Sequence, residues 1–267
     1  MKQTVWDWRA AANFAGGGTG SGLAICAALA TLFSPSPASQ TALLLSAAFV
    51  IIGLALVGSE LGRPLRGLRV FWHPKSSWMT RESFAAVALI CALLGAAFSG
   101  RRELLWLAAV LAGLLLYAQA RMPAAARGIP AWREPRIVPL FILTGLAEGG
   151  GVYLLLAALA NANDMALYVF LLIVLRAVAS ASYVLHVDDA SGRIRAVMSS
   201  LEFPFLGLGT VAPALLLAST PFVWPAVAQM MEALAGILTL TSGWELKFAI
   251  VTRAGFRQTF TAPHLGI

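Results

Sequence analysis

The sequence predicts an all-α fold: a polytopic membrane protein, built as one bundle of about eight transmembrane helices over residues 1–267. Hydrophobic residues make up 59% of the chain and charged residues only 12%. The mean hydropathy is +0.80, and this composition lies outside the range of ordinary water-soluble domains. The apolar runs are rich in Ala, Leu and Gly and do not alternate apolar with polar residues, which favours helices over barrel strands.

Eight apolar runs approach the ~20 residues that a helix needs to cross a hydrocarbon core of ~30 Å. They cover residues 13–33, 41–61, 84–99, 103–120, 137–160, 165–187, 201–219 and 222–242. The third and seventh runs are on the short side. Eight is therefore the expected number of spans, with one more or one fewer as the alternative.

Local signals set where these runs begin and end. The first follows residues 1–12, which carry Asp7, two tryptophans and no cleavable pattern, so we expect it to remain as a helix. The second stops at Gly62 and Pro64, because these residue types end helices. The fifth and sixth runs join through the short segment 161–164. After the eighth, residues 244–260 mix Lys247, Arg253 and Arg257 with aromatic side chains, which predicts an interfacial helix.

Glycines recur at four-residue spacing within the first and fifth runs. Small residues at this spacing let helix backbones approach closely in lipid, where no hydrophobic effect drives helix association. The alternative is that glycine is simply frequent in this chain. The pairs are Gly16/Gly20, Gly18/Gly22 and Gly145/Gly149.

The cations predict the orientation. The N-terminus carries two Lys or Arg residues, the loops after the second, fourth and sixth runs carry five, four and two, and the C-terminal tail carries three. The other side carries only Arg101 and Arg102, and Arg176 lies inside the sixth run. Because cytoplasmic loops hold the excess of Lys and Arg, we expect both termini on the cytoplasmic side of a bacterial inner (plasma) membrane.

Histidines and cysteines argue against a bound metal or haem. Cys26 and Cys91 lie in apolar runs without a CxxC pattern or a nearby histidine, so neither a disulfide nor a metal site is expected. The chain has three histidines, His73, His186 and His264. Only His186 lies near a helix that could hold a haem, so ligation by two histidines is not expected.

Residues 60–82 combine a carboxylate, several guanidiniums, an imidazole and three aromatic rings at the depth of the membrane interface. A quinone headgroup needs this mixture: hydrogen-bonding groups at each carbonyl oxygen, a titratable group to exchange protons, and apolar walls. The alternative is that Arg and Trp only anchor the helix at the lipid headgroups.

Three motifs resemble a known family. The turn Leu-Gly-x-Pro-x-Arg at 61–66, the segment Ser-Trp-Met-Thr-Arg-Glu at 77–82 and Ala-Arg-x-Ile-Pro-Ala-Trp at 126–132 are similar to the membrane-anchor subunit of dimethyl sulfoxide reductase and its relatives. The resemblance covers most of the chain. It implies an anchor without haem that binds a four-cluster iron–sulfur subunit and a molybdopterin catalytic subunit, and that exchanges electrons and protons with quinone.

The same resemblance implies particular site residues. The histidine of the family that interacts with quinol falls on Glu60, and Gly62, Arg66 and Glu82 match its glycine, arginine and glutamate. Because this chain has a glutamate where the family has a histidine, either Glu60 or His73 is the candidate proton acceptor. The full candidate quinone site is Glu60, Gly62, Arg63, Pro64, Arg66, Arg69, Trp72, His73, Trp78, Arg81 and Glu82.

The expected function is a quinone-reactive anchor that passes electrons from a docked iron–sulfur subunit to ubiquinone or menaquinone. Relatives that oxidise sulfite or phenylacetyl-CoA have cytoplasmic catalytic subunits, which agrees with the predicted orientation and favours quinone reduction during sulfite oxidation. The expected partners are therefore these two subunits and membrane lipid, with no nucleic acid. The alternatives are a small secondary transporter and an anchor without a redox role.

Three charged residues lie within the predicted spans: Glu148, Arg176 and Glu232. Because a lone charge in the bilayer is costly, and because Glu148 and Arg176 lie at similar depth in consecutive helices, we expect these two to pair. The pair would fix helix packing, or else would belong to a proton relay with Glu232 or Tyr153. Arg176 also shares a helix face with Ser180 and Tyr183, which predicts a polar path toward His186.

Overall fold

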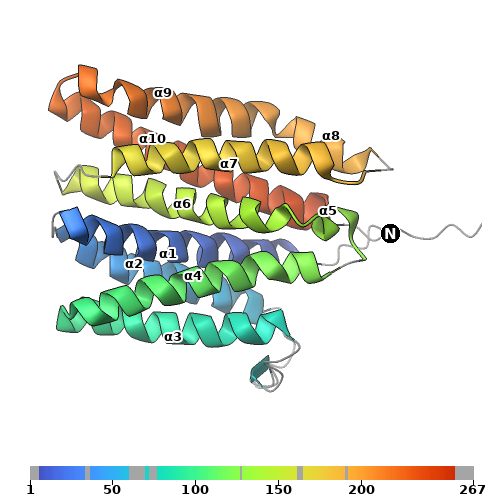
Figure 1. Ribbon diagram of the computed structural model, residues 1–267, viewed down its shortest axis with the longest axis horizontal. Coiled ribbons are helices and arrows are strands. Elements are labelled where there is room, and N and C mark those ends of the chain that lie inside the picture. The colour runs from blue at the N-terminus through green and yellow to red at the C-terminus, as the bar shows by residue number, and fades with distance from the viewer. Residues whose placement is uncertain are drawn as a thin grey trace, which may run out of the picture.

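The computed structural model describes residues 6–33, 37–59, 70–71, 77–126, 128–160, 165–189 and 192–255, and every regular element in them is helical. Eight of the helical segments are long and apolar enough to cross a membrane, which confirms the predicted all-α polytopic bundle. Figure 1 shows these segments running side by side along the long axis of the molecule.

The first four spans are α1 (Trp8–Phe33), α2 (Pro37–Gly58), α3 (Trp78–Ser99) and α4 (Arg102–Ala125). After the short α5 (Pro130–Arg133), α6 (Ile137–Leu159) and α7 (Ala166–His186) follow. The short α8 (Arg193–Ser200) leads into a seventh span made of the π-helix η2 (Glu202–Val211), α9 (Ala212–Ser219) and the 3-10 turn η3 (Thr220–Phe222). The eighth is α10 (Pro225–Phe248), continued by the π-helix η4 (Ala249–Arg253).

Helices α1 and α3 begin well before their predicted apolar runs, because polar caps extend them. Asp7 Oδ1 accepts the backbone N–H of Arg9 at 2.8 Å, which starts α1 at Trp8. Ser77 Oγ accepts the backbone N–H of Thr80 at 3.3 Å, which starts α3 at Trp78. Each cap satisfies a backbone N–H that has no partner within the helix.

The last helix corrects the prediction of a separate interfacial helix over residues 244–260. Helix α10 and η4 continue without a break to Arg253, whereas residues 256–267 lie outside the described residues. Lys247 is therefore part of the eighth span, where its side chain is 1% exposed.

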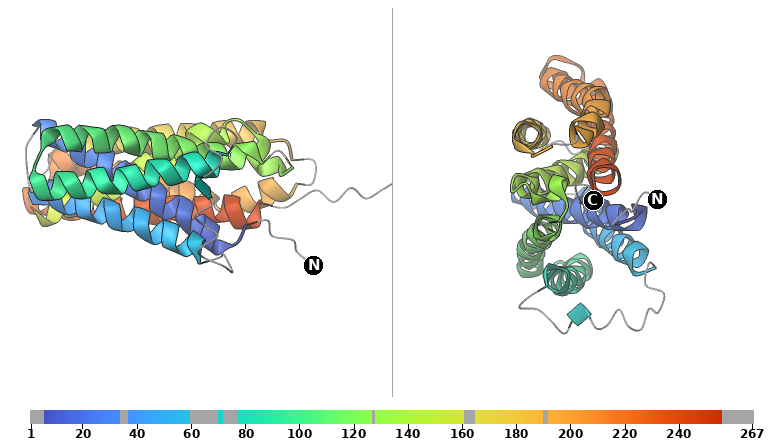
Figure 2. Two further views of the ribbon diagram at one scale, coloured as in Figure 1. Left: turned by 90° about the horizontal axis from the view of Figure 1, so that it is seen from below. Right: turned by 90° about the vertical axis from the view of Figure 1, so that its right-hand side faces the viewer.

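Helix α1 lies at the centre of the bundle and packs against α2, α4, α6 and α10. The end-on view in Figure 2 shows α2, α3 and α4 on one side of it and α7, α9 and α10 on the other. Outward-facing apolar side chains such as Val110, Val178 and Leu215 are more than 60% exposed, as expected where helices meet lipid.

The spaced glycines lie where helix backbones cross, which confirms their predicted role. A Cβ atom on Gly16 or Gly20 would lie 2.7 Å from a backbone oxygen of α2. Gly18 and Gly22 face Gly145 and Gly149 of α6, and a Cβ atom on Gly149 would collide with the backbone of Gly22 and Leu23. Close packing of α1 against α2 and α6 therefore depends on the absence of a Cβ atom at these glycines.

One end of the bundle carries the N-terminus, α5 and α8 (Figure 1). We call it the cation-rich end, because several described arginines lie there, among them Arg9, Arg133, Arg136, Arg193 and Arg195. The opposite end carries Arg101 and Arg102, between α3 and α4.

Candidate functional site

Most residues of the predicted quinone site lie outside the described residues: Glu60, Gly62, Arg63, Pro64, Arg66, Arg69, Trp72 and His73. The described part of this loop, Val70 and Phe71, packs on the first turns of α3. Thr80 Oγ1 donates to the Val70 carbonyl oxygen at 2.5 Å, and the rings of Phe71 and Phe84 meet edge to face at 5.0 Å. Val70 and Phe71 are thus held against the start of α3.

Glu82 is the predicted site residue that points into the bundle, and it is 3% exposed. Its Oε1 accepts hydrogen bonds from Asn13 Nδ2 of α1 at 2.8 Å and from Gln119 Nε2 of α4 at 2.9 Å. Gln119 Nε2 also donates to the Asn13 carbonyl oxygen at 3.2 Å. The three side chains form a buried polar cluster, which we call the Glu82 cluster.

Sequence reasoning did not select Asn13 or Gln119. Both are amides inside apolar runs, where a polar side chain needs a hydrogen-bond partner. A polar residue in an apolar run is therefore the sequence signal that could have identified them as site residues. Gly17 makes room for Gln119, because a Cβ atom there would collide with the Gln119 amide. Asn13 Oδ1 is buried and has no hydrogen-bond partner among the described residues. The cluster therefore has one hydrogen-bond acceptor that these residues do not use.

Trp78 is partly buried and Arg81 is exposed, and both lie in the first turn of α3, just before Glu82. The Arg81 guanidinium lies 4.3 Å from the centre of the Trp78 ring and that of Arg121 lies 5.2 Å from it. Tyr117 meets the same ring edge to face at 5.6 Å. Two cations stacked on one indole form a charged, aromatic surface beside the Glu82 cluster.

Glu148 does not form the ion pair with Arg176 that its depth predicted; it pairs with Lys247. Lys247 Nζ lies 2.7 Å from Glu148 Oε2, and the two side chains are 1% and 0% exposed. Lys247 Nζ also donates to the Phe14 carbonyl oxygen at 3.1 Å. Thr19 Oγ1 donates to Glu148 Oε2 at 3.0 Å and accepts Trp244 Nε1 at 2.9 Å. The physical reason is that α10 continues past its apolar run and brings an ammonium group to the carboxylate.

Arg176 is also buried, and it is held mainly by backbone oxygens. Its Nη1 donates to the Thr239 carbonyl at 3.0 Å, and its Nη2 donates to the Gly209 carbonyl and to Ser242 Oγ, the latter at 3.3 Å. The guanidinium lies 4.9 Å from the centre of the Phe205 ring. Arg176 thereby joins α7 to η2 and α10, and it remains close enough to interact electrostatically with Glu148.

The predicted polar face of α7 is buried, but it does not lead to His186. Ser180 is 4% exposed and Tyr183 is fully buried. Tyr183 Oη donates to the Ala131 carbonyl oxygen at 2.7 Å, so this face ends at α5. His186 is exposed, and its Nδ1 contacts the Ser182 carbonyl oxygen on its own helix. Tyr153 and Glu232, the other residues of the predicted relay, are buried in α6 and α10.

The third family-like motif has a packing role. Trp132 is fully buried, stacks on Trp6 at 4.6 Å and donates Nε1–H to the Ile250 carbonyl oxygen at 3.1 Å. It thus fastens α5 to η4 at the cation-rich end. This hydrogen bond also satisfies the indole N–H, which would be costly to bury alone.

Two of the buried carboxylates, Glu82 and Glu148, are linked to neighbouring residues of α1. Asn13 donates to Glu82, and the carbonyl of the next residue, Phe14, accepts from the lysine paired with Glu148. Within the described residues, no three His, Cys, Asp or Glu side chains gather as metal ligands. Both cysteines are free.

No protein-family model and no curated protein matches this sequence. The family resemblance of the three motifs therefore stays a prediction.

Proposed function

We propose that this chain is the quinone-reactive membrane anchor of a multisubunit molybdopterin and iron–sulfur oxidoreductase. In this proposal, the iron–sulfur subunit docks at the cation-rich end on the cytoplasmic side of a bacterial inner membrane. It passes electrons to ubiquinone or menaquinone, with sulfite as the substrate of the catalytic subunit. The basic loops would attract such a partner by complementary charge.

The observation that carries the proposal is Glu82. Reducing a quinone to a quinol consumes two electrons and two protons, so the quinone site needs a titratable group that can pass protons from the aqueous side. Glu82 is a buried carboxyl in the first turns of α3, on which Val70 and Phe71 pack, and two amide donors fix its orientation. Glu60 and His73 remain the candidates for direct proton exchange with the headgroup.

The complex purified from its native membrane tests this function. Glu82→Gln keeps the shape of the side chain and removes the titratable carboxyl. We expect quinone-dependent turnover to fall by ~10²-fold or more, whereas electron transfer from the catalytic subunit to a soluble dye stays unchanged. The matched control is Glu103→Gln, which neutralises an exposed carboxylate at the opposite end.

Two outcomes would contradict the proposal. If the chain copurifies with no iron–sulfur and molybdopterin subunits, the assignment to such a complex is wrong. If the complex assembles and Glu60→Gln, Arg66→Gln and Glu82→Gln all keep full quinone turnover, the chain is an anchor without a redox role.

A small secondary transporter is the second candidate, because one observation favours it. The first half of the seventh span is the π-helix η2 and not a regular α-helix, and the Gly209 carbonyl of η2 binds the buried Arg176. π-Helical turns often mark functional sites, and irregular helical backbone beside buried charges is a feature of transporter binding sites. Proton-driven solute uptake by the chain alone in liposomes would favour this candidate over the anchor.

A further inference from the structure

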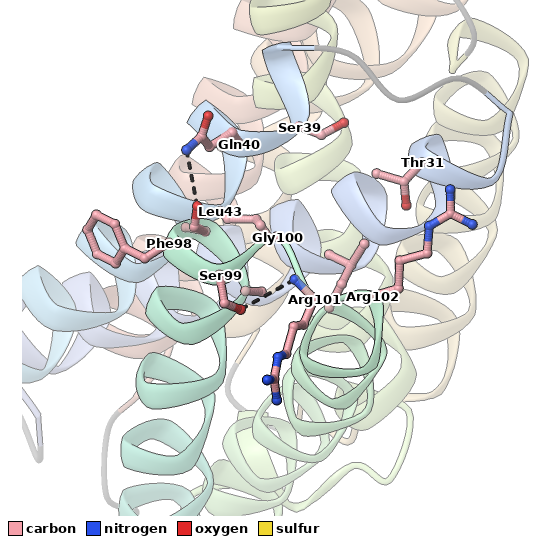
Figure 3. A pocket seen from close by; sticks show the side chains of 12 residues that line it. Thr31, Ser39, Gln40, Leu43, Phe98, Ser99, Gly100, Arg101 and Arg102 are labelled. Atoms are coloured by element: carbon pink, nitrogen blue, oxygen red, sulfur yellow. Dashed lines mark hydrogen bonds between the residues drawn. The ribbon is translucent and has the colours of Figure 1, made fainter.

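A cavity of about 530 Å³ lies at the end of the bundle opposite the cation-rich end. The end of α1, the start of α2, the end of α3 and the start of α4 form its walls (Figure 3). Its polar lining consists of Thr31, Ser39, Gln40, Ser99, Arg101 and Arg102. The volume falls within the range of small-molecule and headgroup pockets, ~300–1,000 Å³.

One hydroxyl in this cavity lacks the partner that its burial requires. Ser39 is 6% exposed, and its Oγ has no hydrogen-bond partner among the described residues. The neighbouring polar groups are already occupied. Gln40 Nε2 donates to the Ala97 carbonyl at 3.1 Å, and Ser99 Oγ donates to the Gly95 carbonyl at 2.6 Å. A buried hydroxyl without a partner costs free energy unless a ligand or water completes it.

The same cavity is electropositive. Arg101 and Arg102 line it, and neither has an ion-pair partner within the described part of the chain. Helices α2 and α4 begin there while α1 and α3 end there, so their dipoles offset one another and the positive charge comes from the arginines. In the view of Figure 3, the Arg102 side chain extends toward Thr31, whereas the Arg101 guanidinium turns away.

The remaining lining is apolar. Leu43, Ala96 and Leu105 are buried, and Phe98, at the rim, is 78% exposed. Since the cavity lies among helix ends, where a bilayer places its headgroups, a ligand with a charged head and an apolar tail would find both surfaces together.

We propose that this cavity binds a phosphate-bearing anion, with Arg102 and Ser39 as its main ligands. The guanidinium pairs with the phosphate oxygens through charge-assisted hydrogen bonds, and the Ser39 hydroxyl donates the bond that it lacks. A net-anionic phospholipid and free phosphate share this chemistry. The apolar rim favours the lipid. This site is separate from the proposed quinone site, and its test does not depend on it.

The test uses the full chain, purified in an uncharged detergent, with phosphatidylglycerol, phosphatidylcholine and inorganic phosphate as separate probes. Native mass spectrometry counts the lipid that stays bound, and thermal unfolding measures the stabilisation by each probe. We expect phosphatidylglycerol to bind more tightly than phosphatidylcholine. Arg102→Gln should weaken its binding about tenfold or more, as the loss of a charge-assisted hydrogen bond implies.

Ser39→Ala removes only one oxygen and should weaken the same binding by a smaller factor, so the test survives if the arginine variant folds poorly. Arg195→Gln, which removes an exposed cation at the other end of the molecule, is the control and should bind like the wild type. Stabilisation by inorganic phosphate as strong as by phosphatidylglycerol would support the site and identify a soluble anion as its ligand. Equal binding of both lipids, or wild-type binding by both Arg102→Gln and Ser39→Ala, would overturn the proposal.

Discussion

Lys247 and Glu148 form an ion pair of 2.7 Å at the centre of the bundle, although hydropathy assigns Lys247 to the tail beyond the last span. The pair joins α10 to α6, and the Phe14 carbonyl and Thr19 hydroxyl of α1 complete it. Gly18 and Gly243 leave the space that it occupies, since a Cβ atom at either would collide with its side chains. Three helices are thereby fixed by one pair of charges.

Removing one partner of this pair should cost far more than removing both. Glu148→Gln leaves a buried lysine without its anion, and Lys247→Met leaves a buried carboxylate, so each should destabilise the protein by ~3–5 kcal/mol. The double variant removes both charges and should be more stable than the sum of the single losses predicts. Thermal unfolding of the four proteins in one detergent measures this coupling, and strictly additive losses would show that the charges act independently.

The contact of α1 with α6 should tolerate no side chain at Gly149. Gly149→Ala would force a methyl group into the backbone of Gly22 and Leu23, and overpacking of this kind should destabilise the fold by ~3 kcal/mol or more. Gly113→Ala is the matched control, because a Cβ atom there meets nothing within 4 Å. Size-exclusion profiles and unfolding temperatures should separate the two variants. Equal stability would mean that the helices move apart without cost.

Arg176 should not be replaceable by lysine. Its guanidinium divides its hydrogen bonds between α10 and η2, and an ammonium group has no planar fork to reach both. Arg176→Lys should lose ~1–3 kcal/mol of stability, while Arg195→Lys, on the exposed α8, should lose almost none. Unfolding temperatures measure the difference. Equal losses of stability in Arg176→Lys and Arg195→Lys would show that the hydrogen bonds of Arg176 do not hold α7, η2 and α10 together.

The buried indole of Trp132, with its N–H hydrogen bond, should contribute to stability. Trp132→Phe keeps an aromatic ring on Trp6 but leaves the Ile250 carbonyl oxygen without its donor, which should cost ~1–3 kcal/mol. Trp106→Phe, at a partly exposed position on α4, serves as the control. The free energy of unfolding from denaturant titration tests this, and a loss no larger than that of the control would remove the role given to the hydrogen bond.

The cap of α1 should weaken in acid. The hydrogen bond from the Arg9 side chain lowers the pKa of the Asp7 carboxyl. A carboxyl with a lowered pKa stabilises the folded state above its unfolded pKa of ~3.9, and that contribution disappears as the pH falls through the folded pKa. Asp7→Ala should therefore cost ~1 kcal/mol near neutral pH, with the gap to the wild type closing in acid. A gap that stays constant throughout the acid range would exclude the carboxylate as its source.

The sequence by itself determined the fold class and the number of spans, because transfer into lipid depends on local composition summed over about twenty residues. It also identified the glycines of α1 and α6, since close approach of helices in lipid needs small residues at a fixed spacing. In the candidate site it selected Glu82, through the motif at 77–82. The loop residues from Glu60 to Arg69 lie outside the described residues, so their prediction stays open.

Only the tertiary structure decided which polar groups meet. Asn13 and Gln119 reach Glu82 from positions 69 and 37 residues away in the chain, and no local pattern records such a distance. Lys247 was misplaced because the polar residues around it resemble an interface. It is buried because α6 offers it a carboxylate, and that interaction depends on which helices become neighbours. Hydropathy predicts whether each segment lies in lipid or in water. The pairing of buried charges depends instead on how the helices pack in the bundle.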